Sequence, residues 1–427
     1  MKDFKIEKFE NGATIILKPI KNIKFTAINM GFKTGAYFDE VKGTAHFLEH
    51  NLFLGTETRT RDEIDRDELE NCSLNAATSL YYTVLRFKRA NSELDRAMQS
   101  ASDILLKTKF NNAEMKKERE VVRNEILSVV ERDKRNVFAY HNTLWSPYLN
   151  DNCCAIVGKD IDKVTRKDLE NYRNKNYIAE NFIMVVASSL PMSKIVGYYK
   201  KYIEPNLKVN KKATPINYEM TPKKPSKMQV ISLDQNKVDV AISINIPFGI
   251  NNYKNRIARP ILAYYLSAEQ PYTNLRKKGL VYACSTSIAE FAYNSLVIIK
   301  FTCSKENVNK IIDEYTKELH NLYKNGMEQS KFDNICKQLI IAEDEKEHDF
   351  LEYQVNECTY FYCVNALTEE LNIRKEMKKI KLQDINKYIS LLNNPKNEIY
   401  VTVLGNIKDN EVYNLEQIQK KFFVNIK

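Results

Sequence analysis

Two stretches of the chain share one pattern of hydrophobic and polar positions. Residues 164–185 read VTRKDLENYRNKNYIAENFIMV, and residues 380–401 read IKLQDINKYISLLNNPKNEIYV. At a constant offset of 216, Asp168 matches Asp384 and Tyr172 matches Tyr388. Each stretch predicts an amphipathic helix followed by an alternating strand. Because the offset is half of the 427 residues, we expect two similar domains and not three.

The first half carries the clearest element signals. Alternating apolar runs predict strands at ATIILKP, KFTAINMGFK and SLYYTVLRFKR. Capping residues predict three helices: one begun by a Thr60–Glu63 capping box, one from Asn91 to Leu106, and one from Ala113 towards Tyr140 that Asn111 or Asn112 caps. Strands followed by runs of helices indicate an α+β fold of two similar tandem domains, each an antiparallel sheet with helices packed on one face.

A polar, proline-containing segment separates the two halves. The stretch YIEPNLKVNKKATPINYEMTPKKPSK holds four prolines and reads as a linker. We therefore expect a first domain over residues 1–202, a linker over 203–227 and a homologous second domain over 228–427.

Composition indicates an ordinary globular protein. Hydrophobic residues make up 43% and charged residues 28% of the chain, which excludes disorder as its main state. No apolar run is long enough to cross a bilayer, and the start MKDFKIEKFENG shows no targeting signal, so we expect a cytoplasmic protein without membrane contact. The eight cysteines lack metal-binding spacings and are expected to be reduced and packed.

The net charge of +10 raises nucleic-acid binding as a hypothesis. Basic and acidic residues are interleaved, however, as in KKEREVVRNEILSVVERDKRN, which is typical of solvated helix faces. We therefore expect no nucleic-acid partner, although a basic enzyme can favour acidic substrates.

Two of the five histidines lie in the motif His46-Phe-Leu-Glu49-His50. Histidines four residues apart on a helix project from the same face and can bind one metal ion. Thr44 is expected to cap this helix. Glu49 can face a water at the metal without being a ligand itself. The other histidines, at positions 141, 320 and 348, have no matching spacing and are expected to be structural or at the surface.

A second helix offers a third ligand. Catalytic zinc typically has three protein ligands and one open position. In EMKKEREVVRNEILSVV, Glu118 and Glu125 are two turns apart on a face that includes valines. Carboxylates on an apolar stripe are costly to bury unless they are paired or bind metal. The alternative, that both reach water at the edge of the stripe, is weakened by the two histidines.

The segments HFLEH, LNAATS, EREVVRNEI and LRKKGLVY together resemble the inverzincin or pitrilysin-like (M16-type) family of zinc metallopeptidases. The resemblance covers nearly the whole chain, and its size is similar to the two-domain branch of mitochondrial processing peptidase and bacterial relatives. It implies a zinc-dependent endopeptidase with one zinc ion per chain. Peptides or flexible segments would be cleaved inside the chamber of a dimer.

The resemblance also implies a role for each matching residue. Zinc would be held by His46, His50 and Glu125, with Glu49 as general base on the zinc-bound water and Glu118 supporting the site from behind. Asn75 and Ala76 of LNAATS would bind the substrate backbone as a strand edge. In the second domain, Arg276 and Tyr282 of LRKKGLVY would contact the substrate and its scissile carbonyl.

One departure from the family pattern leaves the assembly open. Arg276 and Tyr282 are six residues apart, whereas family members usually show seven. In two-domain relatives this pair acts on the zinc site of the partner subunit. The chain could therefore work as a homodimer, or as a heterodimer with a related two-domain subunit that matures a peptide by removing its leader. A noncatalytic scaffold subunit is the competing class.

Overall fold

The chain forms two compact units, each with its own sheet. The computed structural model describes residues 4–70, 74–145, 161–210, 225–247, 249, 253–269, 271–291, 294–349, 351–364 and 377–424. The first unit comprises Met1–Val129, Cys153–Asn217 and Glu345–Leu371, and the second comprises Val130–Asn152, Tyr218–Asp344 and Asn372–Lys427. The boundaries 1–202, 203–227 and 228–427 stay a prediction, and residues 211–224 of the expected linker lie outside the described residues.

A six-stranded sheet forms the centre of the first unit. Its strand order is β1-β2-β6-β3-β5-β4, with the bounds Lys5–Lys8 (β1), Thr14–Pro19 (β2), Phe25–Phe32 (β3), Asn75–Thr78 (β4), Thr83–Ala90 (β5) and Phe182–Ser188 (β6). All neighbours pair antiparallel except β2 and β6, which pair parallel. β4 is an edge strand of this sheet.

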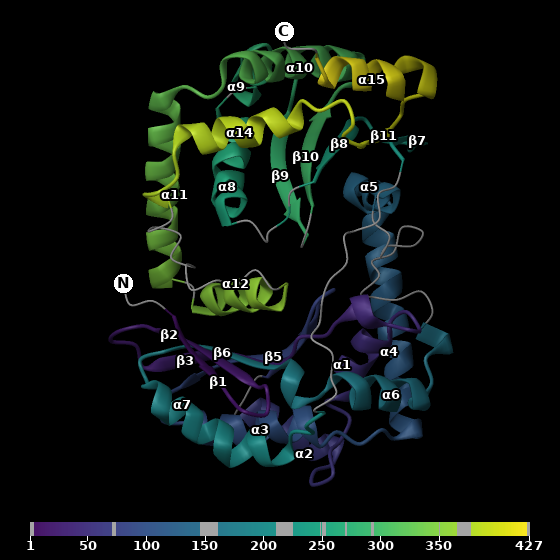
Figure 1. Cartoon of the computed structure of the whole chain (residues 1–427). Helices are drawn as coiled ribbons and strands as arrows, with labels where there is room; N and C mark the ends of the chain where they lie inside the picture. Colours follow the sequence, from purple (N-terminus) through teal and green to yellow (C-terminus); the bar gives the residue numbers. More distant parts are fainter. Residues whose placement is uncertain are drawn as a thin grey trace. The chain divides into compact units, whose positions relative to one another are not determined.

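Helices cover one face of this sheet, and the hydrophobic core of the unit lies between the helices and the sheet (Figure 1). They are α1 (Thr44–Asn51), α2 (Arg61–Glu70), α3 (Leu94–Leu106), α4 (Asn112–Asp133), α6 (Arg166–Asn176) and α7 (Met192–Tyr198), which continues into the π-helical turn η4 (Tyr199–Ile203). Alternate residues of the central strands, such as Ile28, Met30 and Phe32 on β3, pack against them and are fully buried. The period of two that predicted these strands therefore also selects the core.

The opposite face of the first sheet is covered by α12 (Leu351–Cys363), a helix from the second half of the sequence (Figure 1). Asn29 of β3 lies on this face and is 3% exposed. Its side-chain amide donates hydrogen bonds to Asn356 Oδ1 at 2.9 Å and Thr359 Oγ1 at 3.1 Å. These bonds satisfy a polar group that would be costly to bury alone.

The second unit repeats this plan with five strands. The order is β7-β11-β8-β10-β9, with the bounds Lys227–Ser232 (β7), Val238–Ile246 (β8), Ala283–Glu290 (β9), Ser295–Cys303 (β10) and Ile399–Gly405 (β11). Here too a single pair, β7 with β11, is parallel. The core helices are α8 (Tyr253–Ala268), α9 (Tyr272–Lys277), α10 (Val308–Asn325), α11 (Gln329–Asp349), α14 (Leu382–Leu392) and α15 (Leu415–Phe422).

A helix from the first half of the sequence, α5 (Val137–Trp145), covers the other face of the second sheet. His141 of α5 is fully buried there and hydrogen-bonds Thr402 Oγ1 on β11 at 3.1 Å and the hydroxyl of Ser243 on β8. His141 is thus a structural histidine. Each half of the sequence thus contributes one helix to the unit built mainly from the other half. The chain passes from one unit to the other within α4 and within α11.

The internal repeat is visible as matching structure. α6 and α14 have the same length and are offset by 216 residues. In both helices an aspartate, Asp168 or Asp384, accepts a hydrogen bond from the backbone N–H at the N-cap. The predicted α+β class and the two similar domains are confirmed. Two features were not predicted. Each sheet contains one parallel pair of strands, and each sheet has a helix, α12 or α5, on the face opposite its main helices.

Two helix predictions from the first half are wrong in detail. The helix expected from Ala113 towards Tyr140 ends at Asp133, and α5 begins separately at Val137. Asn91 does not cap α3, because the Asn91 side chain hydrogen-bonds Thr26 and Ile23. The N-cap of α3 is Glu93. The Thr60–Glu63 capping box and the Asn111 cap are confirmed.

The described cysteines fit the expectation of packed thiols. Cys284, Cys303, Cys358 and Cys363 are buried and unpaired, and burial raises the pKa of each. Cys72, Cys153 and Cys154 lie outside the described residues. In the part of the chain that the structure describes, no helix is long and apolar enough to span a bilayer.

Candidate metal centre

Helix α1 carries both histidines, and its start is fixed by a carboxylate. Gly43, with a φ of 92°, is the N-cap, so Thr44 is the first helical residue and not the cap that the sequence predicted. Asp39 accepts hydrogen bonds from the backbone N–H groups of Gly43 at 2.8 Å and Ala45 at 2.9 Å. Burial raises the pKa of Asp39 to about 7 against the backbone hydrogen bonds that lower it. Asp39 thereby takes over the capping role.

The two histidines project from one face of α1, as their spacing predicted. The ring centroids of His46 and His50 are 4.7 Å apart, and the rings are nearly perpendicular at 83°. His46 is 7% exposed, and the side chain of His50 is 20% exposed. The pair lies at the boundary between core and solvent, where an ion can be held and still be reached.

Helix α4 brings a carboxylate to the histidines. Glu125 Oε2 lies 3.7 Å from His46 Nε2 and 3.4 Å from His50 Nε2. One ligand atom from each of these three residues lies within 4.8 Å of the others. The side chain of Glu125 is 42% exposed, so the cluster is open to solvent on one side.

This cluster fits a zinc ion in both chemistry and size. Two imidazole nitrogens and one carboxylate oxygen are a donor set typical of catalytic zinc. Ligand atoms about 2.1 Å from a tetrahedral centre are roughly 3.4 Å from one another, by geometry. The two nitrogen–oxygen distances are close to that value, and they are reached without rearranging the helices. His46, His50 and Glu125 can therefore hold zinc and leave one position open.

Glu118 fixes the orientation of His50. Its Oε1 lies 2.9 Å from His50 Nδ1, so the ring presents Nε2 towards Glu125. Glu118 is 7% exposed and is approached at 3.6 Å by the guanidinium of Arg61 on α2. Burial lowers the pKa of His50, but the hydrogen bonds to Glu118 and Glu125 and the nearby negative charges outweigh it and raise the pKa to about 9. A carboxylate behind a metal-ligating histidine is a recurrent arrangement.

Glu49 lies beside the histidines and is held by the edge strand. The Thr78 hydroxyl on β4 donates a hydrogen bond of 2.9 Å to Glu49 Oε2. Burial raises the pKa of Glu49, and the charge of His50 and the bond from Thr78 oppose the rise. Glu49 is thus a partly desolvated carboxylate in a fixed position, which suits a general base.

The predicted substrate-binding residues Asn75 and Ala76 begin β4. They pair with Arg86 and Leu85 of β5 on one side. Among the described strands, β4 has no neighbour on its other side. An edge strand offers backbone N–H and C=O groups to an added strand, and β4 joins this edge to Glu49 through Thr78.

Arg276 and Tyr282 belong to the second unit and are both exposed. Arg276 lies in the last turn of α9, and its Nη1 donates to the Tyr272 hydroxyl at 2.8 Å. Tyr282 precedes β9 and is 76% exposed, with the ammonium of Lys237 4.3 Å from its ring centroid. An exposed tyrosine and arginine on one unit are available to a ligand, but the structure of the unit does not join them to the cluster.

Three supporting residues of the site were missed at the sequence level: Asp39, Arg61 and Thr78. Each acts on a site residue distant in the sequence, so no local spacing reveals it. Thr78 had a partial signal, because it lies in LNAATS, three residues after the predicted substrate-binding Asn75.

Two family profiles match the chain. The profile described as "Insulinase (Peptidase family M16)" matches residues 14–149, and the profile described as "Peptidase M16 inactive domain" matches residues 163–339. The chain belongs to peptidase family M16.

Named relatives match part of the chain. The mitochondrial-processing peptidase subunit beta of Saccharomyces cerevisiae is 32% identical over 200 residues, 46% of this chain and 43% of the relative. A protein named uncharacterized zinc protease from Rickettsia bellii is 28% identical over 199 residues, 45% of this chain and 48% of the relative. The matched region thus spans less than half of each of these relatives.

Solved structures match nearly the whole chain. A protease from Helicobacter pylori aligns with a TM-score of 0.80 and 18% identity, covering 95% of this chain and 100% of that one. The first half of the periplasmic protease PqqL from Escherichia coli aligns with a TM-score of 0.79 and 17% identity, covering 100% of this chain and 97% of that one. At these identities the likeness establishes the fold.

Proposed function

We propose that the protein is a zinc-dependent endopeptidase. The observation that carries the proposal is the convergence of His46, His50 and Glu125 from two helices, with Glu49 beside them. Membership of family M16 and a relative named zinc protease support it. The complete four-residue set argues for a working centre.

The residues divide the work of peptide hydrolysis. Bound zinc would supply a Lewis acid that lowers the pKa of a water and polarises the scissile carbonyl. Glu49 would take the proton from the attacking water and pass it to the leaving amine, with Thr78 holding its carboxylate in place. Glu118 would keep His50 oriented, and Tyr282 would donate to the developing oxyanion.

The substrate would be an extended peptide or flexible segment. It would add to the open edge of β4 at Asn75 and Ala76, which places its backbone next to Glu49 by way of Thr78. Backbone pairing does not depend on side chains, so side-chain preferences would come from elsewhere in the chamber.

The enzyme would act as a dimer in the cytoplasm. Yeast, bovine and human relatives are named as subunits of a processing peptidase, which suggests an assembly of related chains. We propose that Arg276 and Tyr282 serve the zinc site of a partner, either a second copy or a related two-domain subunit. A heterodimer would suit a peptidase dedicated to leader removal.

A noncatalytic scaffold subunit is the second candidate. It is favoured by the match of residues 163–339 to the profile described as an inactive domain and by the six-residue spacing from Arg276 to Tyr282. A scaffold has no need of Glu49 or of the ordered pair His50–Glu118, however, and both are present.

Cleavage of a quenched fluorescent peptide library tests the proposal. The native chain is expected to cleave in the presence of zinc, and Glu49→Gln is expected to lose roughly 10²–10⁴-fold of the rate, as for loss of a general base. Glu120→Gln is the matched control, because Glu120 is exposed on α4 and pairs with Arg123. Cleavage that survives in Glu49→Gln would refute the role of Glu49. A zinc-loaded native chain that stays inactive with any related partner would favour the scaffold.

A further inference from the structure

One arginine of the first unit lies a single strand away from the free edge of β4. Arg86 of β5 pairs with Asn75 of β4 on one side and with Asn29 of β3 on the other. Residues directly opposite one another in antiparallel strands share a face of the sheet. Asn29 faces α12, because its amide hydrogen-bonds Asn356. Arg86 therefore lies on the α12 face, whereas Thr78, three positions after Asn75, points to the helix-covered face that carries Glu49.

The guanidinium of Arg86 has few partners. Its Nε is buried and has no hydrogen-bond partner among the described residues. Its Nη2 donates one long hydrogen bond, of 3.4 Å, to the Tyr82 hydroxyl. Glu352 of α12 pairs with the neighbouring Lys88 at 3.0 Å, and in the part of the chain that the structure describes no carboxylate forms an ion pair with Arg86. A half-buried cation without a counter-ion favours an anionic ligand.

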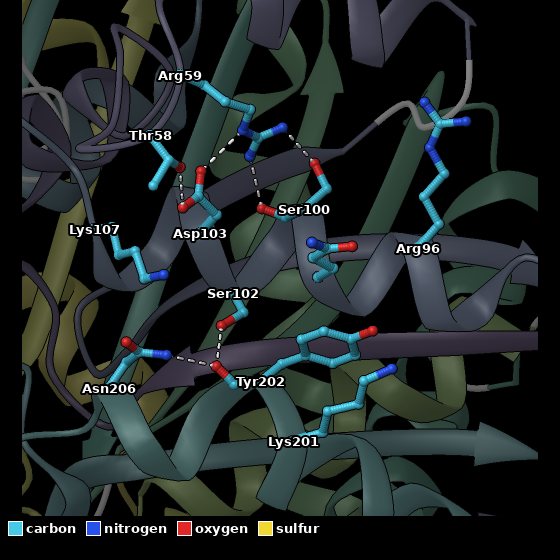
Figure 2. Close-up of a pocket in the computed structure, with 11 residues that line it drawn as sticks. Thr58, Arg59, Arg96, Ser100, Ser102, Asp103, Lys107, Lys201, Tyr202 and Asn206 are labelled. Atoms are coloured by element: carbon cyan, nitrogen blue, oxygen red, sulfur yellow. Dashed lines mark hydrogen bonds and ion pairs between the residues drawn. The ribbon is translucent and has the colours of Figure 1, made fainter.

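Arg59 of the same unit shows how a structural guanidinium is satisfied. Its Nε donates to Asp103 Oδ2 at 2.9 Å, and its two Nη atoms donate to the hydroxyl of Ser100 at 3.0 Å and to the carbonyl of Ser100 at 3.1 Å (Figure 2). All three nitrogens of Arg59 are thus bonded to the protein. Arg86 lacks such a set of bonds, so its charge remains available to a ligand.

A peptide strand added to β4 would bring its side chains within reach of Arg86. Neighbouring strands are about 4.8 Å apart, so a peptide residue opposite β4 lies roughly 10 Å from the backbone of β5. A long arginine side chain and an acidic side chain can bridge this distance together along the surface of the sheet. Arg86 is directed along β5 towards Tyr82 and so passes Val84, which pairs with Ala77. Ala77 carries only a methyl group, which leaves room above β4.

We propose that Arg86 determines substrate specificity by binding an aspartate or glutamate side chain of the peptide. This inference rests on the proposed function, because it requires a peptide strand at the edge of β4. A guanidinium can form two parallel hydrogen bonds to one carboxylate, which an uncharged side chain cannot match. Side chains of a strand alternate between the two faces, so the acidic residue would occupy a position that points to the α12 face. The substrate class is therefore acidic peptides.

Peptide binding to the Glu49→Gln chain tests the proposal without turnover. Rhodamine-labelled, amidated nonapeptide mixtures carry Glu, Gln or Lys at the central position and uncharged residues elsewhere, and fluorescence anisotropy gives their dissociation constants. The Glu mixture is expected to bind roughly tenfold more tightly than the Gln mixture, and the Lys mixture is expected to bind most weakly. Addition of Arg86→Gln should bring the Glu and Gln mixtures to within about twofold of each other. Arg86→Glu should reverse the order of the Glu and Lys mixtures.

Lys88→Gln is the matched control, because Lys88 lies on the same strand and the same face but is paired with Glu352. It should keep the roughly tenfold preference for the Glu mixture. The proposal is overturned by absence of saturable binding, by equal binding of the Glu and Gln mixtures, by a preference that survives Arg86→Gln, or by an equal loss in Lys88→Gln. Circular dichroism shows that each variant is folded.

Cleavage of the same mixtures by the native chain separates this inference from the proposed endopeptidase. Selective binding without any cleavage would refute the endopeptidase and leave the role of Arg86 in peptide binding intact. Cleavage of the Glu and Gln mixtures with equal kcat/KM would refute the role of Arg86 and leave the endopeptidase intact.

Discussion

Single residues behind the candidate ligands order the candidate metal centre. Glu118 reaches His50 Nδ1 at 2.9 Å from helix α4 and is itself approached by Arg61. The imidazole of His50 cannot rotate freely, and its Nε2 is directed towards Glu125. Orientation of this kind lowers the entropy lost when a metal binds.

Removal of this support is expected to weaken zinc binding. Glu118→Ala should raise the zinc dissociation constant roughly 10–100-fold, since loss of such a partner has that typical effect. Competition with a fluorescent chelator measures the constant without any need for activity. Glu120→Ala on the same helix is the control and should bind zinc as the native chain does. Equal constants for native and Glu118→Ala protein would show that the contact has no part in the centre.

Thr78 is expected to be a positioning residue for Glu49. Thr78→Val keeps the shape but loses the hydroxyl that donates to Glu49. Loss of one hydrogen bond to a charged group should lower kcat roughly tenfold or more, with KM much less affected. Thr78→Ser restores the donor and should recover most of kcat. A Thr78→Val enzyme with native kcat would mean that Glu49 is held by other contacts.

At this scale the sequence predicted the candidate ligands and the support from Glu118, but not the other three supporting residues. His46, Glu49 and His50 lie in one motif, and periodicity places Glu118 and Glu125 on one helix face. The resemblance to the family, and not the periodicity, assigned Glu125 as a ligand and Glu118 as its support. Asp39, Arg61 and Thr78 reach the site by tertiary packing, and no periodicity joins them to their partners.

At the scale of elements, the repeat was the most informative part of the sequence. The matched pattern predicted α6, α14 and the strands that follow them. It did so because equivalent apolar residues are buried in both helices: Leu169 and Ile385 are both fully buried. The exchange of α5 and α12 between the halves was not predictable. Their contacts, such as Asn29 with Asn356 and Val137 with Leu404, join residues that are far apart in the sequence.

The buried His141 of α5 is expected to make the free energy of unfolding depend on pH. Burial lowers its pKa to about 3, below the ordinary value of 6.5, so below pH 6.5 the unfolded chain binds a proton that the folded chain does not. The free energy of unfolding should therefore fall by about 1.4 kcal/mol per pH unit from this group as the pH drops from 6.5 towards 3.

Urea unfolding at pH 7 and pH 5 measures this contribution. The native chain should lose about 2 kcal/mol more than His141→Gln between the two pH values. The compared quantity is the change in the free energy of unfolding between the two pH values. A difference in stability between the native chain and His141→Gln at pH 7 therefore does not affect the result. Equal changes in the two proteins would mean that His141 is not buried in its neutral form.

At the scale of the whole molecule, the proposed dimer would build each site from residues of two chains. The candidate ligands His46, His50 and Glu125 belong to the first unit, and Arg276 and Tyr282 belong to the second. If the pair serves a partner, two inactive variants should complement each other.

Co-expression of Glu49→Gln with Tyr282→Phe tests this arrangement in a homodimer. Random pairing makes half of the dimers mixed, and each mixed dimer holds one intact site, so about a quarter of the native activity should return. Each variant alone serves as the control and should remain inactive. Failure of complementation in stable mixed dimers would place Tyr282 at its own chain's site, and an active Tyr282→Phe variant would place it outside catalysis.

Zinc content is the measurement that reaches the central claim most directly. Inductively coupled plasma mass spectrometry of the purified chain, equilibrated with a mixture of divalent metals, should give one zinc ion per chain. Glu49→Gln should keep that ion, whereas His50→Ala and Glu125→Ala should lose it, because only the latter remove a ligand. A native chain that takes up no zinc, or that keeps its zinc without His50 and Glu125, would contradict the account.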